Sequence, residues 1–149
     1  PGGLFAAYEW CMTDAFDPNN AEHLRIKKGI EEGDSLPDIA TVPETLDALR
    51  AAGFEVIESH DTASDCDAET PWYLPLVGET SSLLAVRRGR VGRFFARRLI
   101  RTIEAARIAP KGSAEVSQML GAAAEALIAG GEAGIFTPNY FFLARRPAP

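Results

Sequence analysis

The side chains best suited to chemistry gather in one short stretch near the start of the sequence. This stretch contains Tyr8, Glu9, Trp10, Cys11, Thr13 and Asp14. Aromatic faces stabilise a cation through their quadrupole, and a carboxylate stabilises it by Coulombic attraction. These residue types therefore suit a site where positive charge develops. Pattern alone favours a plainer explanation, because Tyr and Trp often border a core and a Glu at a strand end is usually solvated.

The elements around this stretch predict where it lies. Pro1, Gly2 and Gly3 signal a turn, and the run from Leu4 to Tyr8 is almost wholly apolar. A short apolar run bounded by turn residues is typical of a strand buried on both faces, as in a parallel sheet. In open α/β sheets, ligands bind at the carboxyl ends of the strands. The polar and aromatic residues therefore lie where a site is expected.

Six motifs, in order along essentially the whole chain, resemble the sterol 24-C-methyltransferases. They are YEWCMTD from Tyr8, FDPNNAEHLRIK from Phe16, EEGDSLPDIAT from Glu31, PWYLPLVGE from Pro71, IAPKG from Ile108 and GGEAGIFTP from Gly130. The sequence departs from the family pattern at Ala15, where a basic residue is usual, and at Ala21, where Pro is frequent. Both changes are expected at the surface and leave the resemblance intact.

The resemblance implies an α/β fold. The chain would be the C-terminal part of a class I, Rossmann-like, S-adenosylmethionine-dependent methyltransferase sheet, with a helical insertion before the last strand. The implied activity is methyl transfer from S-adenosylmethionine to carbon 24 of a sterol side-chain double bond. No strand is followed here by the Gly-rich cofactor loop of such enzymes, and the glycines of 130–134 follow a predicted helix. We therefore expect a fragment that is inactive alone and leaves most cofactor binding to other residues.

The implied chemistry assigns roles to individual residues. A double bond that attacks a methyl sulfonium leaves a tertiary carbocation, and a base finally removes a proton. The expected catalytic residues are Tyr8, Glu9, Trp10 and Asp14. Tyr8 and Trp10 would face the cation, or Glu9 would supply the carboxylate; alternate strand residues face opposite sides, so the four cannot all point one way. The expected substrate-binding residues are Trp72, Tyr73 and Cys11.

The segment from Pro71 to Leu76 is apolar, aromatic and bounded by prolines, which predicts that it forms no regular helix. Two functions are open for it. It could be a hydrophobic lid over the edge of the core, or it could line an apolar ligand pocket. The family resemblance favours the pocket.

The 149 residues are predicted to form a single domain. Strands are expected at 4–12, 54–60 and 138–145. By analogy with class I methyltransferases, the last strand would lie antiparallel between the other two. Residues 1–61 would form half of the sheet, 71–134 a sterol-side helical cap and 135–146 the last strand.

Capping signals predict the helices. A helix over 20–32, started by a capping box of Asn19 and Glu22, has few apolar residues and should lie on the surface. A second helix follows the capping box of Thr41 and Glu44 and ends at Gly53. A last helix begins at the cap residue Ser113 and ends at Gly130 and Gly131. Its expected buried face is Val116, Met119, Leu120, Ala123 and Leu127.

Charge is divided unevenly along the chain. Residues 1–80 hold seventeen acidic and four basic side chains, residues 81–149 hold four acidic and eleven basic ones, and the net charge is −6. A helical pattern over 82–108 aligns Arg90, Arg93, Arg97 and Arg101 on one face. This helix would either dock on the sheet with solvated arginines or lie at an anionic membrane surface. The acidity of the whole chain makes nucleic acid a poor partner.

Cys11 and Cys66 offer neither a disulfide framework nor metal-ligand spacing, and two lone thiols fit a reducing compartment. We expect a peripheral protein on the cytosolic face of the endoplasmic reticulum membrane, with homo-oligomerisation left open. Two other functions remain open: a non-catalytic lipid-binding or membrane-docking module, and a methyltransferase of another amphipathic lipid. A Gly-rich loop upstream in the parent gene would favour either enzyme over the module.

Overall fold

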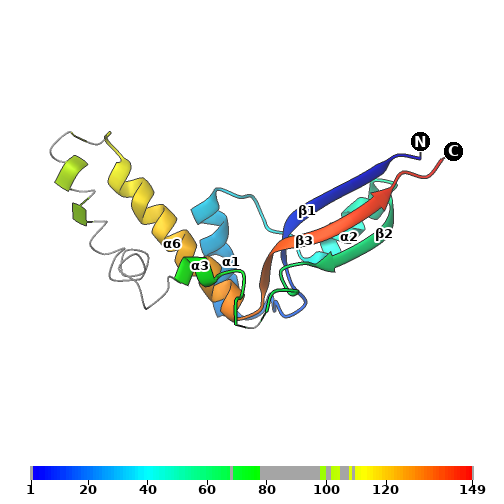
Figure 1. Ribbon diagram of the computed structural model, residues 1–149, viewed down its shortest axis with the longest axis horizontal. Helices are drawn as coiled ribbons and strands as arrows, with labels where there is room; N and C mark the ends of the chain where they lie inside the picture. The colour runs from blue at the N-terminus through cyan, green and yellow to red at the C-terminus, as the bar shows by residue number, and fades with distance from the viewer. Residues whose placement is uncertain are drawn as a thin grey trace.

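The computed structural model describes residues 2–67, 69–77, 98–99, 102–104, 108 and 110–148. A three-stranded sheet stands beside a group of helices (Figure 1). The strands are β1 (Leu4–Met12), β2 (Glu55–Asp61) and β3 (Phe136–Arg145), in the spatial order β1-β3-β2. Since β3 is antiparallel to both neighbours, β1 and β2 run in the same direction. The predicted strands and their order are therefore confirmed.

β1 is more exposed than its apolar sequence predicts. Leu4 is 66% exposed and Tyr8 is 61% exposed, so the expectation of a strand buried on both faces is wrong for this structure. Within the described residues β1 forms a ladder with β3 alone, which leaves its outer edge open. Only the end of the strand is buried, at Cys11 and Met12.

A β-bulge interrupts the pairing of β1 with β3. Glu9 lies opposite Tyr140 and Cys11 opposite Thr137, so two residues of β3, Pro138 and Asn139, face the single residue Trp10. A bulge tolerates Pro because the ladder bond that its missing N–H would make is already interrupted there. The bulge also bends the strands at Trp10, near the carboxyl end of β1.

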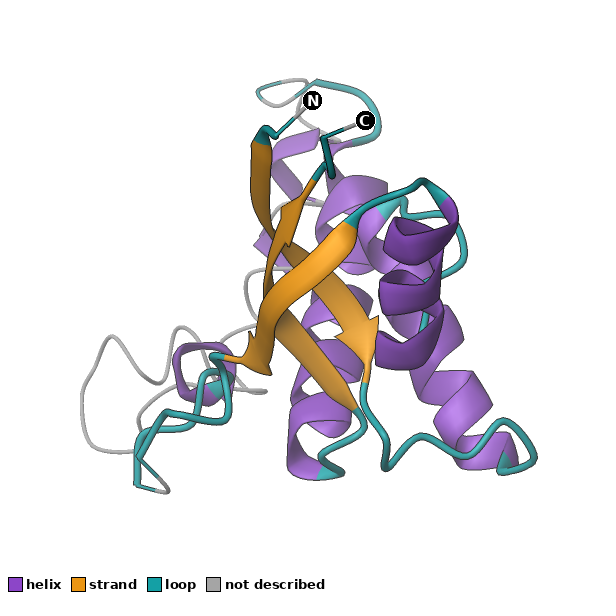
Figure 2. Cartoon of the chain, turned by 90° about the vertical axis from the view of Figure 1, so that its right-hand side faces the viewer, coloured by secondary structure: helices purple, strands orange, loops and turns teal. Residues whose placement is uncertain are grey.

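Helices α1 (Ala21–Asp34) and α6 (Ser113–Glu132) pack against each other beyond the end of the sheet (Figures 1 and 2). A Cβ built on Gly33 would lie only 2.3 Å from the Cβ of Ala123, and one on Gly29 would lie 2.9 Å from that of Ala126. Small residues thus let the two backbones approach closely. The predicted surface position holds for most of α1, and its buried face is formed by Ile26, Ile30 and Gly33 along the same contact.

The main core lies where the sheet meets these helices. Its buried members come from β1, α1, the loop before α2, and the start of β3: Met12, Ile26, Ile30, Ile39, Ile135 and Phe136. Trp10 and Trp72 are partly buried against this cluster. The core therefore lies beside the carboxyl end of β1, where the sequence predicts a site.

The caps of the first two helices agree with the sequence only in part. The N-cap of α1 is Asn20, which accepts hydrogen bonds from the N–H groups of Glu22 and His23. Asn19 instead donates its backbone N–H to Asp17, so the predicted capping box of Asn19 and Glu22 does not form and the cap lies one residue later. α1 also runs past Gly33 and ends at Ser35 in a left-handed conformation. The capping box predicted for α2 (Val42–Ala51) is confirmed, since Thr41 and Glu44 bond each other's backbone N–H.

α6 differs from its prediction at both ends. It follows Gly112 without a side-chain cap, and Ser113 donates its hydroxyl to the carbonyl of Pro110 instead. At the other end it runs through Gly130 and Gly131 to Glu132, and Gly134 makes the left-handed turn into β3. Two glycines in succession weaken a helix without ending it when packing supports them.

The predicted buried face of α6 is correct only in its C-terminal half. Ala123 is buried, whereas Val116 is 52% exposed and Leu120 is 56% exposed. The reason is that α1 ends opposite Ala123, as the Gly33 contact shows, and covers none of the earlier turns of α6. The amphipathic pattern extends further along α6 than its described partner does.

The segment from Pro71 contains one helical turn, α3 (Leu74–Val77), which the sequence did not predict. Pro75 lies in the first turn of α3, where a missing N–H breaks no helical bond. The predicted arginine helix over 82–108, with Arg90, Arg93, Arg97 and Arg101, lies outside the described residues except at 98–99, 102–104 and 108. Within the described part of the chain, no helix is long and apolar enough to cross a membrane.

Gly33→Ala should destabilise the fold by about 1–2 kcal/mol, because the new Cβ would overlap Ala123. The expected loss is a net value, since Ala is a better helix former than Gly by about 1 kcal/mol. Urea unfolding followed by far-ultraviolet circular dichroism measures it. Glu32→Ala, at an exposed position of the same helix, should change stability by less than about 0.5 kcal/mol. A Gly33→Ala variant at least as stable as the wild type would contradict the close packing.

Asp34→Asn should stabilise the protein at neutral pH. The Oδ2 atom of Asp34 is buried without a hydrogen-bond partner, and burial raises the pKa of this carboxyl. The folded state thus binds the proton more tightly than the unfolded state, so stability is lost as the pH rises through the folded pKa. The gain from Asn should be largest near pH 7 and shrink as the pH falls toward about 4. Asp47→Asn, on an exposed ion pair with Arg50, should show no such gain.

Candidate functional site

The side chains of β1 alternate between two environments. On one side Phe5 contacts Phe142, and the thiol of Cys11 meets Thr45 of α2. On the other side Tyr8 contacts Phe141 and Trp10 contacts Phe136. Tyr8 and Trp10 thus share a side of the strand, and Glu9 between them points to the opposite side.

Trp10 belongs to a chain of four aromatic rings, which we call the aromatic cluster: Trp10, Phe136, Trp72 and Tyr73. The ring centroids of Trp10 and Phe136 are 5.4 Å apart at an interplanar angle of 79°. Phe136 and Trp72 are 5.8 Å apart at 63°, and Trp72 and Tyr73 are 5.5 Å apart at 89°. All three contacts are close to edge-to-face, the favoured geometry for aromatic pairs.

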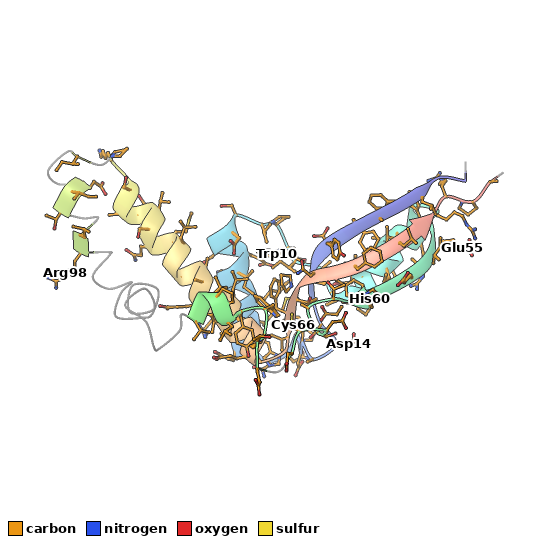
Figure 3. The ribbon with its side chains drawn as sticks, viewed as in Figure 1. Trp10, Asp14, Glu55, His60, Cys66 and Arg98 are labelled. Atoms are coloured by element: carbon orange, nitrogen blue, oxygen red, sulfur yellow. The ribbon has the colours of Figure 1, made fainter. Side chains whose placement is uncertain are left out.

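The aromatic cluster joins three segments that are distant in sequence. Trp10 comes from the bulged end of β1, Phe136 is the first residue of β3, and Trp72 and Tyr73 precede α3. Trp10 lies where the sheet meets α1 and α6 (Figure 3). Phe136 is only 2% exposed, whereas the other three rings are partly exposed around it. The cluster can therefore offer ring surface to an apolar ligand or a cation while Phe136 holds it together.

A second aromatic row crosses the sheet on the same side as Trp10. Tyr8 and His60 both lie opposite Phe141 in the strand pairing, one on β1 and one on β2. The ring of Phe141 is 5.3 Å from Tyr8 and 5.5 Å from His60. Tyr8 extends the aromatic surface along β1 but makes its contact with Phe141 rather than with the aromatic cluster.

Glu9 lines a groove on the opposite side of β1. The groove has a volume of about 720 Å³ and lies between the sheet and α2, with Phe5, Phe54 and Phe142 in its walls. The carboxylate of Glu9 is exposed and accepts a hydrogen bond from the backbone N–H of Trp10 at 3.1 Å. Trp10 also lines this groove, so the structure brings Glu9 and Trp10 together there, whereas Tyr8 contacts Phe141 and does not line it.

Two further predicted site residues lie apart from the aromatic cluster. Cys11 is fully buried, and its Sγ is 3.4 Å from Oγ1 of Thr45. Burial raises the pKa of the Cys11 thiol, so it is a packed structural side chain and offers no surface to a sterol. Asp14 is exposed on the turn that follows β1 (Figure 3). The backbone and hydroxyl of the neighbouring Thr13 fasten this turn to Ile135 and Gly134.

Comparison with known proteins finds relatives that match nearly the whole chain. The family model "Sterol methyltransferase C-terminal" matches residues 83–148. The chain is 55% identical over 147 residues to cycloartenol-C-24-methyltransferase of Arabidopsis thaliana, across 99% of this chain and 43% of that protein. It is 44% identical over 154 residues to sterol 24-C-methyltransferase of Kluyveromyces lactis, across 99% of this chain and 41% of that protein. Along nearly its whole length the chain is therefore similar to part of the sterol 24-C-methyltransferases.

The solved structures agree with this assignment at the level of the fold. A Galdieria sulphuraria protein named as a sarcosine dimethylglycine methyltransferase superposes with a TM-score of 0.54, over 98% of this chain and 42% of that one. The sequence identity is 15%, so this similarity establishes the fold alone. The predicted class I methyltransferase fold is confirmed. The chain spans less than half the length of the curated relatives it matches.

The described residues do not build a Gly-rich cofactor loop. A class I loop needs glycines between the end of a strand and the start of a helix. The glycines with positive φ are Gly2, Gly53, Gly112 and Gly134. Two of them lead from a helix into a strand, Gly2 precedes the first strand, and Gly112 follows no strand. None of these described glycines therefore forms the loop that would bind S-adenosylmethionine. In the described ranges, no group of three or more acidic, His or Cys side chains could hold a metal ion.

Sequence reasoning missed Phe136, the ring that joins Trp10 to Trp72. The residue lies in the family motif from Gly130, where the pattern indicates only a turn and the entry into a strand. One available signal was the predicted topology, because an antiparallel last strand begins beside the carboxyl end of the first. Its first aromatic residue could have been placed next to Trp10 on that basis.

Cys66 should react with iodoacetamide much faster than Cys11. Cys66 is exposed, whereas Cys11 is buried and its raised pKa leaves less of the reactive thiolate at a given pH. Mass spectrometry of the labelled peptides at pH 8 should find Cys66 modified first, and Cys11 only in denaturant. Equal labelling of the two residues in the folded protein would show that β1 and α2 do not pack as described.

Proposed function

We propose that this chain forms the sterol-side wall of an enzyme that transfers a methyl group from S-adenosylmethionine to carbon 24 of a sterol side-chain double bond. The names of the relatives support the reaction, and their identity of 44–55% extends over 99% of this chain. Since the chain spans less than half of those proteins, the activity belongs to a larger polypeptide. This chain would supply substrate contacts and charge stabilisation, while other residues bind the cofactor.

The aromatic cluster is the observation that carries this proposal. Trp10 and the pair Trp72–Tyr73 were assigned to the site from separate motifs, and the structure joins them through Phe136. A sterol is rigid and apolar, so partly exposed aromatic rings suit its binding. Tyr8, on the same side of β1, would extend this surface.

The chemistry explains why aromatic rings are useful here. S-adenosylmethionine supplies the methyl group as an electrophile bound to a positively charged sulfur. The sterol double bond forms the new carbon–carbon bond and is left as a tertiary carbocation, which then loses a proton to a base. An aromatic face near the cation would stabilise it by about 0.5–2 kcal/mol. Trp10 contacts Phe136 in the aromatic cluster and also lines the groove that Glu9 lines, so an aromatic ring and a carboxylate could both act near the cation.

A peripheral position on the cytosolic face of the endoplasmic reticulum membrane would suit a protein that takes up a water-insoluble sterol. Eight arginines occur between residues 87 and 107. Each basic side chain near an anionic surface can contribute about 1 kcal/mol to binding. We propose peripheral attachment on this compositional ground, and binding to anionic liposomes that weakens with added salt would support it.

The test of the proposed function is a chimera. The matching 147 residues of the Arabidopsis protein are replaced by this chain, and methylated sterol is measured after incubation with S-adenosylmethionine labelled in the methyl group. The chimera should methylate a sterol with a side-chain double bond, and the Arabidopsis protein lacking the segment should not. A folded chimera that binds sterol but transfers no methyl group would contradict the proposal and favour the non-catalytic lipid-binding module.

In an active chimera, Trp10→Leu should lower kcat by about two- to thirtyfold, the rate equivalent of losing one cation–π contact of about 0.5–2 kcal/mol. Trp10→Phe keeps an aromatic face and should retain most of the rate. Glu9→Gln should have the smaller effect, because the exposed Glu9 carboxylate already accepts a hydrogen bond from the backbone N–H of Trp10. A larger loss for Glu9→Gln than for Trp10→Leu would show that the reacting carbon lies on the α2 side of the strand. Far-ultraviolet circular dichroism checks that each variant is folded.

A further inference from the structure

Two consecutive glycines lie inside the last turns of α6, and each lies against an aromatic residue. A Cβ built on Gly130 would lie 3.1 Å from the Cβ of Phe136. A Cβ built on Gly131 would lie 2.2 Å from Cδ1 of Tyr73 and 2.9 Å from its Cγ. The ring of Tyr73 therefore lies directly on the helix backbone at Gly131, and any side chain there would displace it.

The backbone conformation does not explain why Gly131 is a glycine. Gly131 is helical and has no positive φ, so an Ala would adopt the same conformation without strain. Ala would also favour the helix by about 1 kcal/mol. The ring of Tyr73 is thus the one observed constraint that requires a residue without a Cβ at this position.

The position of Tyr73 affects the rest of the aromatic cluster. Tyr73 meets Trp72 edge-on, Trp72 meets Phe136, and Phe136 meets Trp10. The Cβ of Phe136 lies against the backbone of Gly130. Trp72 contacts both Tyr73 and Phe136, so each of its two aromatic neighbours lies against one of the two glycines.

We propose that Gly131 is a positioning residue that determines which sterols fit against the aromatic cluster. By leaving the helix backbone bare, it fixes the ring of Tyr73, and through Tyr73 it orients Trp72. The assignment of a sterol as the substrate rests on the proposed function. The contact between Gly131 and the ring of Tyr73 is observed independently of that function. Two experiments separate these parts.

The first experiment is spectroscopic and does not require enzymatic activity. The chain has two tryptophans, and both belong to the aromatic cluster, so their signals report on its packing. Near-ultraviolet circular dichroism and tryptophan fluorescence of the 149-residue chain therefore report on the cluster. Gly131→Ala should weaken the near-ultraviolet signal and shift the emission to longer wavelength. Glu132→Ala, at the next and exposed position of α6, is the matched control and should leave both spectra unchanged.

The double variant Gly131→Ala/Tyr73→Ala tests whether the ring is the cause. Without the ring the new methyl group has room, so the double variant should unfold at a higher urea concentration than Tyr73→Ala alone. This non-additivity would show direct coupling of the two positions. If Gly131→Ala fails to fold and the double variant folds, the inference is supported. If both fail to fold, or if Gly131→Ala is more stable than the wild type with unchanged spectra, the inference is overturned.

The second experiment uses the chimera with two sterols that differ by one ring methyl group. Gly131→Ala should raise KM for the sterol about tenfold, change kcat less, and alter the ratio of kcat/KM between the two sterols. Altered spectra with an unchanged sterol ratio would overturn the role in specificity. A chimera that is inactive before any substitution refutes the proposed function and the sterol part of this inference, and the spectra still decide the contact of Gly131 with Tyr73.

Discussion

The central position of β3 is the constraint on which the rest of the structure depends. β1 and β2 do not pair with each other, and each is held in the sheet by β3. Because β3 is antiparallel to both, its first residues lie beside the carboxyl ends of both neighbours. Phe136 is thereby placed against Trp10, and the next residue, Thr137, donates a hydrogen bond from its hydroxyl to Asp61 at the end of β2. The contact between Trp10 and Phe136, at the centre of the aromatic cluster, is a direct result of this topology.

Local signals in the sequence predicted the sheet well. The three apolar runs gave the strands within two residues, and the capping box of Thr41 and Glu44 gave the start of α2. Both depend on interactions between residues close in the chain. The order of the strands came from family resemblance, since periodicity carries no information on which strand lies in the middle.

The errors arose where packing between distant segments decides the structure. Sequence reasoning missed the close packing of α1 on α6, where Gly29 and Gly33 bring the two backbones together and Ile26 and Ile30 are buried. The glycine pair lies inside α6 and leaves room for its neighbours, the Cβ of Phe136 at Gly130 and the ring of Tyr73 at Gly131. The joining of Trp10 to Trp72 likewise needs Phe136 from a third segment. Glycines that make room for a neighbour look the same in sequence as glycines that break a helix.

The open edge of β1 has a consequence for the behaviour of this chain in concentrated solution. An unpaired strand is a template for pairing with another chain, and natural edges are guarded by Lys, Pro or a bulge along their length. From Leu4 to Tyr8 this edge carries none of these, and its side chains are apolar or aromatic. The N–H and C=O groups of this edge are therefore accessible to another strand. Any self-association of the chain alone would have to be distinguished from the subunit arrangement of the larger polypeptide, which should be measured on that polypeptide.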